Sequence, residues 1–140
     1  MEESCVLVGT DFSAGSAAAL VEARRLASRL GCGLRVVHVV ESERARDWEP
    51  STDARGWMER GGLSEGELDV RFGRAWVELA RFADTLTPAL VVVGSHGASG
   101  HQTVSMGTTA QRLCLNARHP VVLVGPKRQV PRRWASHLGV

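Results

Sequence analysis

Several features that define large classes of protein are missing from this sequence of 140 residues. No stretch approaches the run of about 18 apolar residues that a membrane-spanning helix needs, so no membrane association is expected. The first residues, Met1 to Ser4, are acidic where a secretory signal would be basic, and the expected compartment is the cytoplasm. The three cysteines, Cys5, Cys32 and Cys114, form no Cys-x-x-Cys pair, which favours reduced thiols over a disulfide framework or a zinc site.

An excess of charge of one sign is also missing. The 17 Lys and Arg exceed the 15 Asp and Glu by a formal net charge of only +2, which does not indicate a nucleic-acid partner. The length predicts one domain, placed at residues 1–126. Residues 127–140 contain Lys127, Arg128, Arg132 and Arg133 without an acidic residue, and they are expected to form a solvated basic tail. A weak contact with an acidic partner is the alternative.

Short apolar runs alternate with segments of helical periodicity. Helices are predicted between Ser13 and Gly31 and over 76–83 and 108–117, and strands are predicted over 6–9, 34–40, 68–72, 89–93 and 121–124. Successive parallel strands need right-handed crossovers, so this alternation predicts a doubly wound α/β fold with a mainly parallel sheet and helices on both faces. Between 41 and 67, only 52–60 has the pattern of a short helix. An irregular, mobile segment is expected there, with Trp48, Trp57 and Met58 packed against the edge of the sheet. A cap over the ligand crevice and a surface for a partner are the alternatives for these three residues.

Glycines cluster where the fourth predicted strand gives way to a helix, between Gly94 and Thr109. Glycine lets a ligand approach the backbone closely, and a helix N-terminus offers unpaired N–H groups at the positive end of its dipole. This combination suits a phosphate group, with Thr108 and Thr109 as additional hydroxyl donors. His96 and His101 lie in the same loop and are candidates for contact with phosphate or ribose. A glycine-rich turn that binds nothing is the alternative.

The spacing of this loop is specific. Gly94, Gly97, Gly107 and Thr108 follow the pattern G-x2-G-x9-G-[S/T] of ATP-binding members of the universal stress protein family, which the chain resembles. The resemblance also covers residues 9–13 after the first predicted strand, 37–40 in the second and 119–124 in the last. It implies the strand order 3-2-1-4-5 in a five-stranded sheet, with a ligand crevice between the first and fourth strands.

The resemblance also implies which residues meet an adenine nucleotide. Thr10, Asp11 and Val39 are expected on the adenosine side, Val93 and Gly94 near the ribose, and Gly97, Gly107, Thr108 and Thr109 near the phosphates. The implied ligand is ATP, ADP or AMP, with or without Mg²⁺. No Lys or Arg occurs from Gly94 through Gln111, so backbone N–H groups must meet most of the phosphate charge and the predicted affinity is modest.

The predicted function is a nucleotide-binding module for stress response or signalling, which forms a homodimer through its last strand as many members of the family do. The sequence contains neither a Gly-x-Ser-x-Gly nucleophile elbow nor a Walker Gly-x4-Gly-Lys-[Ser/Thr] motif, and no catalytic residue is predicted. Two alternatives are a slow ATP hydrolase and a ligand-free dimerisation module of the same family. A receiver domain also fits the length, but it leaves the glycine-rich loop unexplained and lacks an Asp after the third strand.

Overall fold

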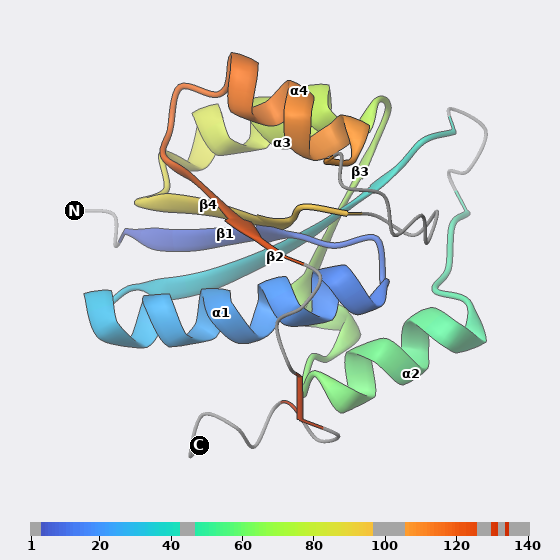
Figure 1. Ribbon diagram of the computed structural model, residues 1–140. Coiled ribbons are helices and arrows are strands. Elements are labelled where there is room, and N and C mark those ends of the chain that lie inside the picture. Colours follow the sequence, from blue (N-terminus) through green and yellow to red (C-terminus); the bar gives the residue numbers. More distant parts are fainter. Residues whose placement is uncertain (1–3, 43–46, 97–105, 126–129, 132–133, 135–140) are drawn as a thin grey trace.

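In the computed structural model, the chain forms an open sheet with helices on both faces (Figure 1). The structure describes residues 4–42, 47–96, 106–125, 130–131 and 134. All neighbouring strands are parallel, and their order confirms the predicted fold class and topology. The strands, in the order β3-β2-β1-β4-β5 across the sheet, are β1 (Cys5–Gly9), β2 (Gly33–Val40), β3 (Leu68–Phe72), β4 (Leu90–Gly94) and β5 (Val121–Val124).

Two helices cover each face of the sheet (Figure 1). The helices α1 (Ala14–Leu30) and α2 (Thr52–Arg60) lie on one face, and α3 (Ala75–Leu86) and α4 (Thr108–Asn116) lie on the other. The predicted limits of α1 are confirmed. Its N-cap is Ser13, whose side chain accepts a hydrogen bond from the N–H of Ser16, and its C-cap is Gly31 in the left-handed conformation, with φ 66°.

Each face of the sheet has its own apolar core. Val6 and Val8 of β1 point into the cluster under α1, whereas Leu7 points into the cluster under α3 and α4. Helices therefore bury both sides of the central strands, which explains why these strands read as continuous apolar runs in the sequence. The carboxyl ends of β1 and β4 are left to form a crevice.

The short helix indicated by the pattern of residues 52–60 is present, within the segment after β2 that was otherwise expected to be irregular. These residues form α2, which begins at the N-cap Ser51, and a 3-10 turn at Glu65–Glu67 follows. Trp57 is only 1% exposed and packs with Met58 in the α1-side cluster rather than at the sheet edge. The apolar face of α2 is short. Its position was not predictable from the sequence around 52–60, because these residues are buried by contacts with the distant helix α1.

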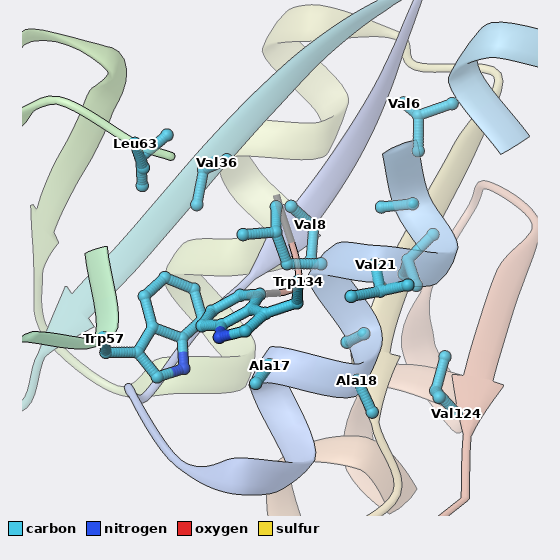
Figure 2. Packing of buried hydrophobic residues seen from close by; sticks show 14 of the residues in the cluster. Val6, Val8, Ala17, Ala18, Val21, Val36, Trp57, Leu63, Val124 and Trp134 are labelled. Atoms are coloured by element: carbon cyan, nitrogen blue, oxygen red, sulfur yellow. The ribbon is translucent and has the colours of Figure 1, made fainter. Parts of the chain in front are cut away.

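The last described residues return to the α1 and α2 side of the sheet. Trp134 is only 3% exposed and packs against Trp57, with ring centroids 4.9 Å apart (Figure 2). The expected solvated tail is therefore corrected at this position, because an indole ring gains more from burial than from exposure to water. The four basic residues of the tail lie outside the described residues.

The structure also bears on membrane-spanning helices and on the cysteines. Among the described residues, no helix is both long and apolar enough to cross a membrane. The thiols of Cys5, Cys32 and Cys114 are all unpaired, and they are buried, half-buried and exposed, respectively. Burial raises the pKa of the Cys5 thiol, which keeps it protonated and favours a packing role.

Candidate functional site

A pocket of about 330 Å³ lies at the carboxyl ends of β1 and β4, where the strand order changes direction. Open α/β sheets bind their ligands at this topological switch point. Every predicted site residue that the structure describes lines the pocket, whereas Gly97 and His101 lie outside the described residues. The lining residues are Gly9, Thr10, Asp11, Ser16, Val37, Val39, Ala75, Leu79, Val93, Gly94, His96, Gly107, Thr108, Thr109 and Ala110.

One part of the pocket is apolar. Val37 and Val39 of β2 lie on the same side of the strand, and Leu79 of α3 and Val93 of β4 add aliphatic side chains. A surface of this kind suits a flat, weakly polar ring better than a charged group. Of these residues, the sequence predicted Val39 and Val93. Val37 was missed, although the two-residue period of a strand places it beside Val39.

The turn after β1 forms a wall whose polar groups bond to one another. The buried Thr10 hydroxyl donates to Ser16 Oγ at 3.0 Å and accepts from the backbone N–H of Phe12 at 2.9 Å. The Thr10 carbonyl accepts a hydrogen bond from His38 Nδ1 at 2.8 Å, so this ring nitrogen bears the proton. Thr10 is thus held by its side chain and its main chain, and its hydroxyl shapes the turn.

Asp11 is exposed at the mouth of the pocket. Its Oδ1 accepts a hydrogen bond from the backbone N–H of Ser13 at 3.0 Å. Ser13, and not Asp11, is the N-cap of α1, because the Ser13 hydroxyl accepts from the Ser16 N–H. Asp11 therefore shapes the turn in front of the helix while its carboxylate lines the pocket.

The opposite wall is the start of α4. Its N-cap is Gly107, which has no side chain to accept hydrogen bonds from the N–H groups of the first turn. Thr108, Thr109 and Ala110 of that turn line the pocket. The start of α3 differs, because the Glu41 carboxylate accepts from the Ala75 N–H at 3.0 Å. The helix α1, which also begins at the pocket, has the Ser13 hydroxyl as its cap, so among the described residues a side-chain acceptor is found at the start of α1 and of α3 but not at the N-cap of α4.

The start of α1 lies close against the end of β4. A Cβ atom on Gly94 would lie 2.9 Å from the Gly15 carbonyl oxygen, and a Cβ on Gly15 would lie 2.5 Å from the His96 carbonyl oxygen. Glycine is thus needed at both positions for the backbones to approach this closely. Gly94 was predicted as a contact to ribose, and the structure adds a packing role.

Ser95 fixes the ends of the loop between β4 and α4. Its backbone N–H donates to the Val124 carbonyl at 2.9 Å, and its carbonyl accepts from the Gly107 N–H at 2.7 Å. Its hydroxyl is 2.8 Å from His96 Nδ1, which orients the imidazole at the pocket. Ser95 was not predicted, because a serine beside a glycine carries no distinctive sequence signal.

The sequence also missed lining residues from neighbouring elements. Ser16 and Ala75 are small side chains near the start of α1 and α3, and Leu79 lies one helical turn after Ala75. Helical periodicity marked Leu79 only as a core position, because it cannot tell which end of a core faces a crevice. Within the described part of the chain, no three His, Cys, Asp or Glu side chains are grouped closely enough to hold a metal ion.

Comparisons with known proteins agree with this architecture. The model of the universal stress protein family matches residues 5–125. A universal stress protein of Mycolicibacterium smegmatis is 29% identical over 136 residues, which cover 87% of this chain and 46% of that protein. The chain therefore spans less than half the length of this relative.

Solved structures share the fold. The universal stress protein UspA from Lactobacillus plantarum has a TM-score of 0.71 at 20% identity, over 89% of this chain and 99% of that one. A universal stress protein in complex with cAMP has a TM-score of 0.65 at 22% identity, over 91% of this chain and 100% of that one. Because the family model covers nearly the whole described fold, from β1 to the end of β5, the chain belongs to the universal stress protein family.

Proposed function

We propose that this protein is a binding module for adenine nucleotides and that the pocket between β1 and β4 is the binding site. The observation that carries the proposal is the pairing of an apolar surface with a helix N-terminus whose N-cap is glycine. A nucleotide needs both, because its base is flat and weakly polar whereas its phosphates are anionic. The cAMP complex of a protein with the same fold is consistent with such a ligand.

The base would lie against Val37 and Val39, with Thr10 and Asp11 on the adenosine side, and the ribose would lie near Val93. The turn after β1 is held by hydrogen bonds within itself, so the ligand meets a wall that is already in place. Such preorganisation lowers the entropy lost on binding.

The phosphates would lie at the start of α4, near Gly107, Thr108 and Thr109, with His96 alongside. Gly97 belongs to the same predicted set. Mg²⁺, if used, would be held by phosphate oxygens and the Asp11 carboxylate, since protein-bound Mg²⁺ commonly has one or two carboxylate ligands and several waters. The absence of Lys and Arg from 94 to 111 leads us to expect modest affinity, with ADP and AMP competing with ATP.

A substitution at the N-cap of α4 tests this site. Gly107 has extended backbone angles, φ −63° and ψ 156°, which other residues adopt readily. In Gly107→Asp, a carboxylate accepts from the first-turn N–H groups and places a negative charge where the phosphate would lie. We expect calorimetry to show affinity for ATP, ADP and AMP weakened by about tenfold or more, since hydrogen bonds to charged groups contribute about 1.5–3 kcal/mol.

Gly107→Asn is the matched control, because its side chain has the same size and caps a helix about equally well without a charge. Its affinity should fall between those of the wild type and Gly107→Asp, and the free energy of unfolding should change by only a few tenths of a kcal/mol in both variants. The titrations include cAMP and are run with and without Mg²⁺. No heat with millimolar nucleotide, or equal affinity in the wild type and Gly107→Asp, would refute the site.

We also propose a homodimer through β5. This strand is at the edge of the sheet, with β4 as its described neighbour, and Val121, Val122 and Leu123 are only half-buried. An apolar edge strand of this kind favours pairing with another strand. Sedimentation equilibrium tests the proposal, and a monomer at the highest soluble concentration would contradict it.

Hydrolysis of ATP and ligand-free dimerisation remain the alternatives. Single-turnover hydrolysis with Mg²⁺ distinguishes the first, since a rate equal to that of Gly107→Asp would argue against catalysis at this site. Mass spectrometry of the denatured, freshly purified protein addresses the second, because a bound nucleotide would be released and identified. The division into a unit of residues 1–126 and a basic tail of 127–140 also stays a prediction.

A further inference from the structure

Aromatic rings surround Phe12, which follows the pocket residue Asp11. The Phe12 ring centroid is 4.5 Å from that of His38, 5.5 Å from that of Trp57 and 6.3 Å from that of Trp48. Phe12 has φ 63°, a left-handed conformation that is strained for a residue with a large side chain. Such a conformation persists only where its surroundings hold it, so these rings maintain the shape of the turn.

Trp57 also holds this turn by a hydrogen bond. Its Nε1–H donates to the Ser13 carbonyl oxygen at 3.0 Å. The backbone N–H of the same Ser13 donates to Asp11 Oδ1. Trp57 therefore holds Ser13, whose N–H in turn orients the Asp11 carboxylate at the pocket.

Trp134, near the C-terminus, completes the packing around Trp57. The two rings are 4.9 Å apart at an interplanar angle of 71°, and Figure 2 shows them next to each other in the cluster that contains Val36 and Ala17. The Trp134 indole packs closely over Gly61. A Cβ atom at residue 61 would lie 3.0 Å from two atoms of the indole, so a larger residue there would crowd the ring. The contact joins the C-terminal segment to the turn through a single intervening side chain.

We propose that Trp134 is a positioning residue for the pocket: its docking on Trp57 holds the Asp11–Phe12–Ser13 turn in the conformation that meets the ligand. The effect on ligand binding rests on the function proposed above, whereas the effect on the turn does not. By thermodynamic linkage, nucleotide binding and docking of the C-terminal segment then favour each other to the same extent.

The test compares Trp134→Ala with Trp134→Phe in the full chain. We expect Trp134→Ala to speed hydrogen exchange at the Phe12 and Ser13 amides and at the Trp57 indole N–H, as followed by NMR. Its nucleotide affinity by calorimetry should fall by at least about fivefold, the lower end of typical coupling between sites. Trp134→Phe keeps an aromatic ring at this position and should restore most of both properties.

Leu26→Ala is the control for lost stability, because Leu26 packs on the same cluster near the opposite end of α1 from Ser13. If Leu26→Ala speeds exchange at Phe12 and Ser13 as much as Trp134→Ala does, Trp134 contributes only to global stability and the proposal is wrong. Unchanged exchange and affinity in Trp134→Ala would also overturn it. If wild type binds no nucleotide but Trp134→Ala still loosens the turn selectively, the proposed function fails while the positioning role stands.

Discussion

The turn after β1 has its polar groups bonded by side chains of the turn, of α1 and of neighbouring elements, whereas α4 begins with a glycine that has no side chain to accept from the N–H groups of the first turn. In the first wall, Thr10 bonds to Ser16 and Asp11 bonds to the Ser13 N–H. In the second, Gly107 is the N-cap: its carbonyl accepts from the Gln111 N–H, but it has no side chain to accept from the N–H groups of the first turn. The first wall has a fixed shape, and the second has donors for an anion.

With two unlike walls, one crevice can bind two unlike chemical groups. A flat base is recognised by shape, which needs a wall held in place from behind. An anion is recognised by hydrogen-bond donors, and these must not already be bonded to acceptors of the protein itself. Next to the first wall, Gly15 of α1 lies against Gly94 at the end of β4, the strand from which the loop to α4 begins.

The largest expected effect comes from removing the support of the first wall. Trp57→Ala deletes a buried indole and its hydrogen bond to the Ser13 carbonyl, and it should lower the free energy of unfolding by about 3–5 kcal/mol. Trp57→Phe keeps an aromatic ring and should cost clearly less. Urea denaturation measures both, and a cost under about 1 kcal/mol for Trp57→Ala would show that the turn needs no such support.

An intermediate effect is expected where α1 lies against the end of β4. In Gly94→Ala the new Cβ meets the Gly15 carbonyl oxygen at 2.9 Å, so backbone must move, and overpacking of this kind costs about 1–3 kcal/mol. The Gly66→Ala variant is the matched control, because nothing lies within 4 Å of a Cβ built there. Equal stability of the two variants in urea would mean that α1 can move away from the end of β4 at no cost in free energy.

The smallest expected effect is on the pH dependence of stability and comes from Glu67, which belongs to neither wall. It serves as a reference for pH experiments on the pocket. Hydrogen bonds from the Ser64 hydroxyl and N–H lower the pKa of the Glu67 carboxyl. Its stabilisation is therefore fully present above the ordinary glutamate pKa of about 4.3 and is lost as pH falls through the lowered pKa. Because Glu67 is exposed, we expect under about 1 kcal/mol.

Comparison of Glu67→Gln with the wild type in urea at neutral and acidic pH tests this prediction. The difference in the free energy of unfolding between the two proteins should shrink on acidification. Ser64→Ala, which removes the hydroxyl donor, should lose part of the same pH dependence. If Glu67→Gln is instead more stable than the wild type at neutral pH, the carboxylate destabilises the folded state and the prediction is wrong.

The sequence predicted the strands and α1 closely, because their signals are local. A buried parallel strand is a continuous apolar run, and Ser13 and Gly31 mark the ends of α1 by their own chemistry. Glycine spacing also indicated the start of α4, since Gly107 precedes its first residue. By contrast, Ser16 and Val37 were not connected to the pocket, because nothing in their neighbourhood in the sequence marks which end of an element borders it.

Local sequence thus determined the order and type of the elements, the fold class and the placement of the glycine-rich loop, since periodicity, capping and β-branching act over a few residues. The tertiary structure decided the contacts between distant segments: the packing of Trp134 on Trp57, the approach of Gly15 to Gly94 and the bond from His38 to Thr10. These contacts join residues far apart in the chain, and their energy depends on shape complementarity that exists only once the sheet has assembled.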